Sequence, residues 1–325
     1  MSLLSIRAVT LAVLFCASAA AQNPEQERQL SAGRDLRALG HYREALQVFT
    51  NLLRDAEQHG AAAVFEAAIL DDLAVTEQGL GNFAAAETRL TRSLAILKAS
   101  GASARETAPV EGHLGEVYLE EGRPREAEPL FRRVLETRQK ETPADPANTA
   151  VALADLAMAR KHLGKLGEAE TLLRQAVALL ENRFGPDHPM VASILGPLAS
   201  TLTKQTHYKE ALALTERTWR ILSKDPRVAD PDLINTMSAL GFLYCMTGQP
   251  KEAEFYARQA VAKAEAIYGP DHARLGWHLA NYADVMKSIG HKNEAKAAQQ
   301  RATAILARNQ QANPVRHTVN VNALR

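Results

Sequence analysis

The chain has 325 residues, of which 46% are hydrophobic and 23% are charged, with 38 Lys plus Arg against 37 Asp plus Glu. This near-neutral balance gives no support to a nucleic-acid partner, because a protein that binds the phosphate backbone is expected to carry a basic excess or a basic stripe. With two cysteines in the whole chain, a scaffold built on several disulfides is also excluded.

Residues 1–21 have the features of a secretory signal peptide. Arg7 supplies the positive start, residues 8–16 form an apolar core, and Ala19-Ala20-Ala21 offers a small-x-small cleavage site. The apolar run is far shorter than the roughly 18–20 residues that span a bilayer, so we expect no membrane span after cleavage. We predict cleavage after Ala21 and a secreted or periplasmic protein, with a bacterial envelope as the favoured location.

Export also decides the state of the cysteines. Cys16 is removed with the signal peptide, and Phe15 before it stands where a lipoprotein signal carries a small residue. The mature chain then keeps Cys245 and can form no internal disulfide. Its stability must therefore come from packing.

After the signal peptide, a helix-breaking turn recurs with a nearly constant period of about 42 residues. Glycine suits such a turn because it adopts a positive φ without steric cost. Six of the seven turns supply it, and Thr206 is the exception. The turn residues are Gly40, Gly81, Gly122, Gly164, Thr206, Gly248 and Gly290.

Two further positions recur in the same register. An acid-alanine pair follows each turn residue by four positions in six of seven cases, beginning with Glu44-Ala45, and Ala85-Ala86 is the exception. Twelve positions before the second alanine, every repeat carries Gly or Ala. A small residue on one helix that faces a small residue on the next would allow close approach of an antiparallel pair. These small residues are Gly33, Ala74, Gly115, Ala157, Ala199, Gly241 and Ala283.

The pattern resembles tetratricopeptide repeats, and the long period resembles the kinesin light chain type. The resemblance implies an all-α fold, a right-handed superhelical solenoid of seven antiparallel helix pairs. HEAT or armadillo repeats are the alternative, but a fixed glycine-to-acid-alanine spacing fits them less well. We expect the solenoid over residues 22–309, with repeats near 25–59, 62–99, 105–141, 146–183, 188–223, 230–268 and 271–309.

The last repeat and the tail differ from the middle of the array. Polar residues on its second helix, such as Lys292, Lys296 and Gln299, are typical of a solvent-facing end repeat. In the tail, residues 310–325, the stretch 318–323 alternates polar and apolar side chains and could pair as an edge strand with a partner. A flexible tail is the favoured prediction.

Two linkers share the motif aromatic-Gly-Pro-Asp-His, at residues 184–188 and 268–272. Proline and aspartate favour a turn that caps the following helix. Metal binding is disfavoured, because neither Asp-His pair has further ligands at zinc or calcium spacing. We therefore expect no metal site.

The chain contains no catalytic signature that we recognise, and we expect neither an enzyme nor a cofactor. Cys245 with a histidine partner is the one conceivable nucleophile. It follows Tyr244 on an expected helix, where a buried, inert thiol is the commoner state.

The resemblance implies that the first helices line a concave groove that binds a partner. There, basic pairs such as Arg34 with Arg37 and Lys161 with Lys204 are too scattered to form a clamp for a carboxylate. Phe242, Met246 and Trp277 form its apolar part, although Trp277 could instead pack between repeats. The predicted groove residues are Arg37, Asp71, Gln78, Glu116, Asp155, Lys161, Ser200, Asn235, Phe242, Met246, Trp277 and Asp284.

These features predict an exported, non-catalytic scaffold that binds a protein or peptide in its groove and that could belong to an envelope complex. One alternative is a structural spacer that uses the convex face or the ends of the array. A weaker alternative is an accessory domain of an enzyme.

Overall fold

The computed structural model describes residues 24–143, 145–224 and 230–312, and the secondary structure of these residues is helical throughout. The predicted signal peptide lies outside the described residues, and so do residues 313–325 of the predicted tail. Residues 310–312, which the prediction assigned to the tail, belong to the last described helix, which ends at Ala312. The chain divides into two compact parts, and the division falls after Leu179, within a helix. We call residues 24–179 the N-terminal half and residues 180–312 the C-terminal half.

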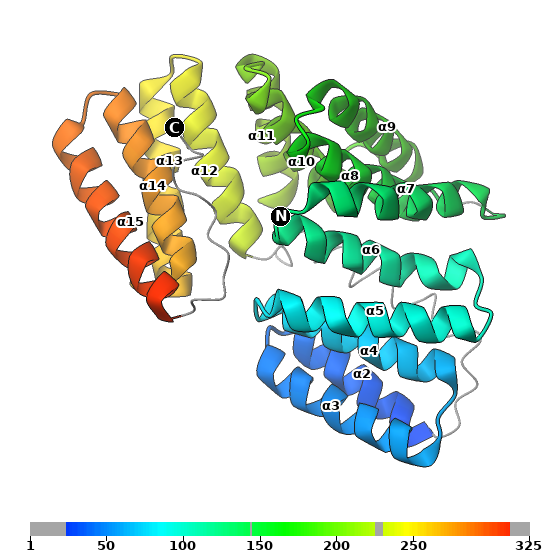
Figure 1. Ribbon diagram of the computed structural model, residues 1–325. Helices are drawn as coiled ribbons and strands as arrows, with labels where there is room; N and C mark the ends of the chain where they lie inside the picture. The colour runs from blue at the N-terminus through cyan, green and yellow to red at the C-terminus, as the bar shows by residue number, and fades with distance from the viewer. Residues whose placement is uncertain (1–23, 144, 225–229, 313–325) are drawn as a thin grey trace. The chain divides into compact units, whose positions relative to one another are not determined.

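In the N-terminal half, successive antiparallel helix pairs lie side by side (Figure 1). Each first helix packs against its own second helix and against the neighbouring pair, so each repeat buries its apolar face only on its neighbours. The helices are α2 (Pro24–Ala38), α3 (Tyr42–His59), α4 (Ala63–Gly79), α5 (Phe83–Ala99), α6 (Ala104–Glu120), α7 (Pro124–Lys140), α8 (Pro146–His162) and α9 (Leu166–Phe184), the last of which contains the division.

The C-terminal half continues the same pattern with α10 (Pro189–Lys204), α11 (Tyr208–Leu222), α12 (Asp230–Met246), α13 (Pro250–Tyr268), α14 (Ala273–Ser288) and α15 (Lys292–Ala312). The described chain thus forms seven helix pairs, as the repeat pattern predicts. The core of this half is rich in alanine, including Ala253, Ala257, Ala260 and Ala264, which lets its helices approach closely.

The turns between paired helices have the predicted backbone. All six turn glycines adopt a positive φ, between 73° and 95°, and Thr206 adopts a φ of 64°. A non-glycine residue is uncommon in this region of φ/ψ space. The repeat therefore imposes its turn geometry even where the sequence departs from glycine.

The small residue of the first helix makes room for the second helix, although the predicted small-to-small contact is wrong in two repeats. A Cβ on Gly33 would lie 2.5 Å from Phe49 Cε1, and a Cβ on Gly115 would lie 2.7 Å from Phe131 Cε1. In these repeats the glycine has no side chain, and a phenyl ring occupies the space that a Cβ would need. Gly241 instead faces alanine, as predicted, and a Cβ added to it would lie 3.1 Å from the Ala257 Cβ.

The two aromatic-Gly-Pro-Asp-His linkers do cap the following helices, but the capping residue is the histidine and not the predicted aspartate or proline. The His188 Nδ1 accepts from the Met190 N–H at 3.2 Å, and the His272 Nδ1 accepts from the Arg274 N–H at 3.1 Å. Each imidazole also stacks on the aromatic ring that ends the preceding helix, with ring centroids 4.7 Å and 5.2 Å apart. Stacking orients the ring so that its lone pair faces the helix.

Candidate functional site

The first helices of the N-terminal half are joined to each other by ion pairs. Arg34 and Arg37 of α2 both reach Asp72 of α4, each with an N–O distance of 2.8 Å. Arg37 also donates to the Asp72 backbone carbonyl at 3.1 Å. The Asp72 side chain is buried, so it needs these two guanidinium groups to compensate its charge. Arg37, a predicted groove residue, is therefore engaged within the protein.

The next first helix continues this arrangement. Asp71 of α4 lies 2.6 Å from the His113 Nδ1 of α6, and both side chains are mostly buried. Among the other predicted groove residues of this half, Glu116 is half-buried, and Gln78, Asp155 and Lys161 are buried. The buried side chains of Gln78, Asp155 and Lys161 offer little surface to a partner. The predicted polar lining thus lies largely inside the array.

The C-terminal half places its predicted residues differently. On its first helices Ser200, Asn235 and Asp284 are exposed, and Phe242 is half-buried. Two large apolar side chains are also exposed, Met246 by 42% and Trp277 by 54%. Both side chains are therefore accessible to a partner.

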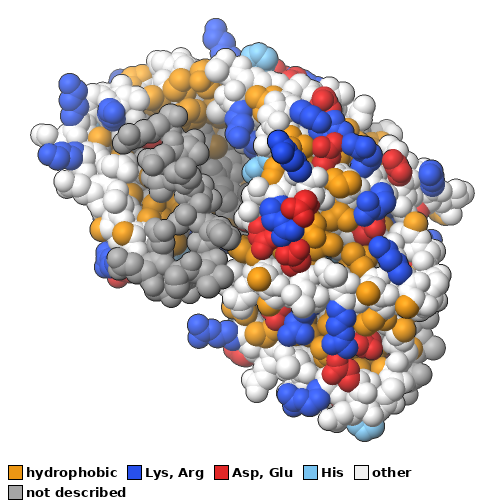
Figure 2. Space-filling view, in the orientation of Figure 1, with side chains coloured by type: hydrophobic (Ala, Val, Ile, Leu, Met, Phe, Trp, Pro, Cys, Tyr) orange, Lys and Arg blue, Asp and Glu red, His pale blue; other side chains and the backbone are white. Residues whose placement is uncertain are grey.

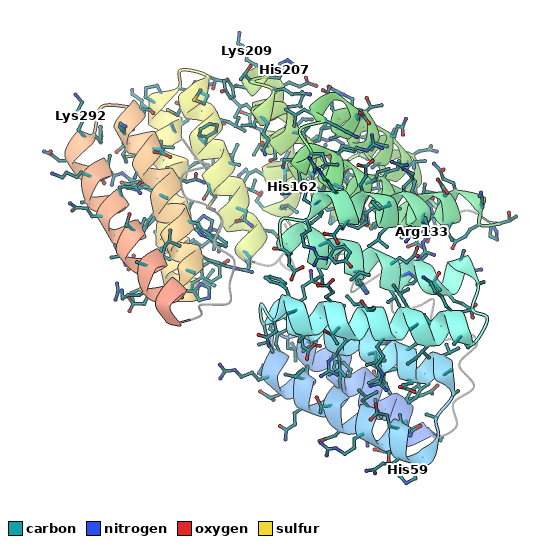
Figure 3. All side chains as sticks on the ribbon, viewed as in Figure 1. His59, Arg133, His162, His207, Lys209 and Lys292 are labelled. Atoms are coloured by element: carbon teal, nitrogen blue, oxygen red, sulfur yellow. The ribbon has the colours of Figure 1, made fainter. Side chains whose placement is uncertain are left out.

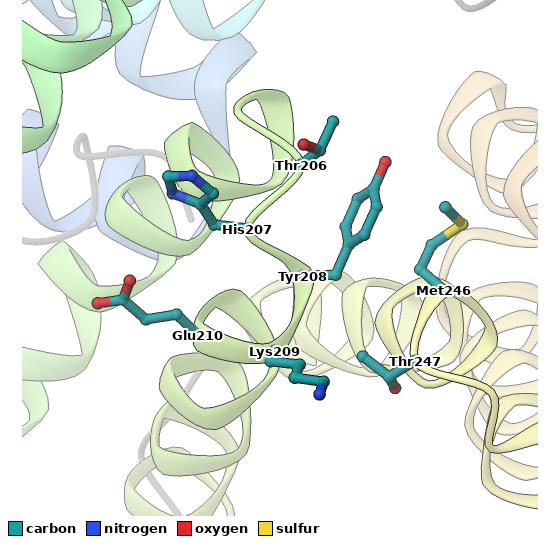
Figure 4. A pocket seen from close by; sticks show the side chains of 7 residues that line it. All are labelled: Thr206, His207, Tyr208, Lys209, Glu210, Met246 and Thr247. Atoms are coloured by element: carbon teal, nitrogen blue, oxygen red, sulfur yellow. The ribbon is translucent and has the colours of Figure 1, made fainter.

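Phe242 and Met246 lie near a side chain that the sequence analysis did not single out, Tyr208 at the start of α11. The Tyr208 and Phe242 rings meet edge to face, with centroids 6.3 Å apart. Tyr208 and Met246 line one open pocket of about 520 Å³ (Figure 4). The lining residues are Thr206, His207, Tyr208, Lys209, Glu210, Met246 and Thr247, and Figure 3 shows His207 and Lys209 at the end of α11 near this turn.

One signal in the sequence could have pointed to Tyr208. The residue two positions after the turn residue is aromatic in three repeats, as Tyr42, Phe83 and Tyr208. In the first repeat this ring covers Gly79 at the end of the next first helix, where a Cβ would overlap Tyr42. The aromatic position therefore contacts the following repeat, and in the C-terminal half that contact involves Met246.

Trp277 belongs to a separate part of the surface. In the repeat register it matches Asn235, which lies seven positions before Phe242, and this spacing corresponds to roughly 10 Å along a helix axis. Trp277 does not line the pocket. The predicted apolar group is thus two features, a pocket beside Met246 and an exposed indole on α14.

A buried contact next to Trp277 holds α12 and α14 together. The Ser238 Oγ and His278 Nδ1 are hydrogen-bonded at 2.8 Å, and both residues are buried. Burial, with a smaller contribution from Arg274, lowers the pKa of His278 to about 4. The ring is therefore neutral at pH 7, and α14 is held rigidly beneath the exposed indole.

The second helices carry an aromatic group that the sequence analysis missed. Tyr256 of α13 stacks on Tyr244 at 5.5 Å and meets Trp219 of α11 edge to face at 6.0 Å. Phe255, which packs edge to face on Tyr256, is 58% exposed. Burial first, and then the hydrogen bond to Glu216, raises the pKa of Tyr244. This group offers a second apolar surface, on the opposite helix layer from Trp277.

Cys245 and the metal-ligating side chain types can be located among the described residues. Cys245 is half-buried and packs against the core of the C-terminal half, and no group of three or more His, Cys, Asp or Glu side chains in the described parts could hold a metal ion. No described helix is long and apolar enough to cross a membrane. On the face shown in Figure 2, basic and acidic side chains are interspersed.

Comparison with protein families gives a match to the tetratricopeptide repeat model over residues 65–140, 145–224 and 231–308. Among curated proteins, the Arabidopsis thaliana Protein KINESIN LIGHT CHAIN-RELATED 3 is 25% identical over 177 residues, which are 54% of this chain and 27% of that protein. This chain therefore spans about a quarter of the length of that relative. The match agrees with the kinesin light chain type of repeat inferred from the period.

Solved structures share the fold. BtubC (BKLC) from P. vanneervenii has a TM-score of 0.55 and 21% identity, covering 76% of this chain and 94% of that chain. A Rap protein complexed with competence and sporulation factor has a TM-score of 0.62 and 14% identity, covering 95% of this chain and 96% of that chain. At these identities the similarity concerns the solenoid fold.

Proposed function

The chain belongs to the tetratricopeptide repeat family, and from this premise we propose that it is an exported, non-catalytic scaffold that binds a protein or peptide partner. The binding surface we propose is the first-helix face of the C-terminal half. Its partner-binding residues are Met246, Trp277 and Phe242, flanked by exposed polar side chains such as Asn235 and Asp284. A cell-envelope complex is the proposed setting.

The observation that carries this proposal is the exposure of Met246 at the end of α12 and of Trp277 on α14, a helix whose other large apolar residues are buried. Leu275, Leu279 and Met286 of α14 are all within the core, whereas Trp277 on the same helix points away from it. Burying a large aromatic side chain stabilises a complex by about 1.5–3 kcal/mol. Such residues therefore favour association with an apolar partner.

The comparisons support a binding role in a general way. The Rap protein of similar fold is described as complexed with competence and sporulation factor, so a solenoid of this architecture holds a partner in that case. That this chain also binds a protein or a peptide is our proposal. The export step is proposed from the signal peptide pattern of residues 1–21 alone.

A capture experiment tests the surface. The chain from Gln22 is immobilised and incubated with envelope extract, beside the double variant Met246→Ala/Trp277→Ala and the matched control Phe255→Ala. All three changed side chains are large, apolar and exposed, but Phe255 lies on a second helix. Circular dichroism verifies that each variant remains helical. We expect the double variant to lose a specific band that the control retains.

The alternative of a structural spacer makes the opposite prediction. It would use the outer helix layer, where Phe255 packs on Tyr256. Loss of the band in Phe255→Ala with retention in Met246→Ala/Trp277→Ala would favour this alternative and contradict the proposed surface.

Export is tested separately. Mass spectrometry of the protein recovered from the envelope fraction is expected to give a chain that begins at Gln22. Recovery of a chain that still begins at Met1 from the cytosolic fraction alone would contradict it.

A further inference from the structure

Met246 differs in exposure from the other methionines of the described residues. Its side chain is 42% exposed, whereas Met286 is fully buried and Met158, Met190 and Met237 are half-buried. Oxidation of a thioether depends on access of the oxidant to the sulfur. Met246 therefore has the largest exposed fraction among the described methionines, and we expect it to be the one that a peroxide in solution reaches first.

This methionine also supplies much of the apolar lining of its pocket. Figure 4 shows the thioether of Met246 and the ring of Tyr208 on facing sides, with Thr206, Lys209 and Thr247 around them. The other lining side chains carry polar or charged groups. A change in the polarity of Met246 therefore changes the chemical character of the whole pocket.

Hydrogen-bond donors are available for an oxidised side chain. Tyr208 and Lys209, whose side chains carry a hydroxyl and an ammonium donor, line the same pocket, and a sulfoxide oxygen is a strong acceptor. The reduced thioether is at most a weak acceptor. The pocket thus suits two states of the same residue, an apolar thioether that lines it together with Tyr208 and a polar sulfoxide that can be hydrogen-bonded.

We propose that Met246 is an oxidation site for hydrogen peroxide and related two-electron oxidants, and that its sulfoxide form weakens partner binding at this face. In the reaction the sulfur lone pair forms an S–O bond as the peroxide O–O bond breaks, and water leaves. The thioether is oxidised by two electrons and the peroxide is reduced. A methionine sulfoxide reductase with a thiol reductant reverses the change.

The effect on binding rests on the proposed function, whereas the modification itself does not. Conversion to the sulfoxide replaces a flexible apolar side chain with a polar one, which disrupts Met-rich contacts. An exported protein meets external oxidants directly. The face would then bind its partner under reducing conditions and release it under oxidative stress.

The modification is tested with hydrogen peroxide as the probe. The chain from Gln22, carrying Cys245→Ser so that the neighbouring thiol does not react, is treated and then quenched with catalase. Peptide mass spectrometry follows each methionine. We expect near-complete conversion at Met246 while Met286 stays unmodified. Oxidation of Met286 or Met158 at the same rate would overturn the assignment.

The binding consequence is tested by the capture experiment with the treated protein as bait. For each protein the band after peroxide treatment is compared with the band of the same protein without treatment. We expect treatment to abolish the band of the original chain and to leave this ratio unchanged in Met246→Leu, whatever the untreated binding of that variant. Met246→Gln, which resembles the sulfoxide in polarity, should lose the band without treatment. Equal loss in treated Met246→Leu would overturn the role of Met246. Absence of a specific band with untreated protein would contradict the proposed function instead, and the mass spectrometry would still decide the modification.

Discussion

The two halves of this molecule differ at the contact between the tyrosine after the turn and the end of the next first helix. In the N-terminal half Tyr42 covers Gly79, and the ring fills the space that a side chain would need. In the C-terminal half Tyr208 and Met246 stand in the equivalent places and line an open pocket. The tyrosine is the same in both contacts. The contact is closed where the next first helix has glycine at this position, and a pocket is present where it has methionine.

A second pair of contacts, which share one of their two register positions, shows the same division. Asp71 bonds to His113 of the following repeat, and Ser238, which matches Asp71 in register, bonds to His278. The N-terminal half also has the ion pairs of Arg34 and Arg37 with Asp72. The N-terminal half thus uses ionic contacts between first helices, while the C-terminal half uses a neutral one and leaves the apolar side chains of Met246 and Trp277 exposed.

The largest expected effect comes from removing the acid at the centre of the ionic contacts. Asp72→Ala leaves Arg34 and Arg37 facing each other without their carboxylate, and we expect a loss of about 3 kcal/mol in the free energy of unfolding. Urea unfolding of the chain from Gln22 measures it. The control Asp35→Ala, at an exposed site on α2, should change stability by less than about 0.5 kcal/mol. Equal effects would show that the buried ion pairs do not stabilise this half.

Acidic pH should lower the free energy of unfolding through the contact between His278 and Ser238. The pKa of His278 is lowered to about 4, so at mildly acidic pH the unfolded chain binds a proton that the folded chain does not. This contribution to stability is complete above pH 6.5, the ordinary histidine value, and is lost as the pH falls towards 4, by roughly 2–3 kcal/mol.

Urea unfolding at pH 7.5, 6 and 4.5, compared with His278→Gln, measures this loss. Glutamine can keep a hydrogen bond to Ser238 but does not titrate, so its stability should fall less over the same range. A variant with the same pH dependence as the original chain would rule out His278 as the cause.

A single methyl group added at the contact between Tyr42 and Gly79 should destabilise the protein. Gly79→Ala places a Cβ against Tyr42, and we expect a loss of about 1–2 kcal/mol from overpacking, measured by the thermal unfolding midpoint. Gly167→Ala is the control, because a Cβ there meets nothing within 4 Å. It should be neutral within about 0.5 kcal/mol. If Gly79→Ala were equally neutral, the ring would be free to move and the two halves would differ less than the contacts indicate.

The smallest effects concern the helix caps. In the N-terminal half Asp145 caps α8 by accepting from the Ala147 N–H at 2.9 Å, whereas His188 and His272 cap α10 and α14 in the C-terminal half. Replacing His188 by Ala should cost about 1 kcal/mol, and His188→Asn should retain most of the stability. Hydrogen exchange at the Met190 amide reports the cap. Unchanged exchange in His188→Ala would mean that stacking on the preceding aromatic ring alone orders this helix start.

Much of the fold could be predicted from the sequence because its signals are local. A turn residue at nearly constant spacing, with small residues at fixed distances from it, specifies where each helix pair bends and where it packs. The sequence was less informative about contact partners. Small residues at Gly33 and Gly115 were expected to face small residues, yet they accommodate Phe49 and Phe131, and the linker histidines cap the helices in place of aspartate.

Which of the predicted groove residues are exposed depended on tertiary structure. Periodicity placed Asp155, Lys161, Met246 and Trp277 alike on first helices, because it identifies a helix face and nothing beyond it. Whether that face is buried depends on the side chains of the next repeat, which are distant in the sequence and differ from one repeat to the next. The sequence by itself therefore determined the repeat, its turns and its helix pairs through local conformational preference. Only the packing between repeats decided that Asp155 is buried and that Met246 borders a pocket with Tyr208.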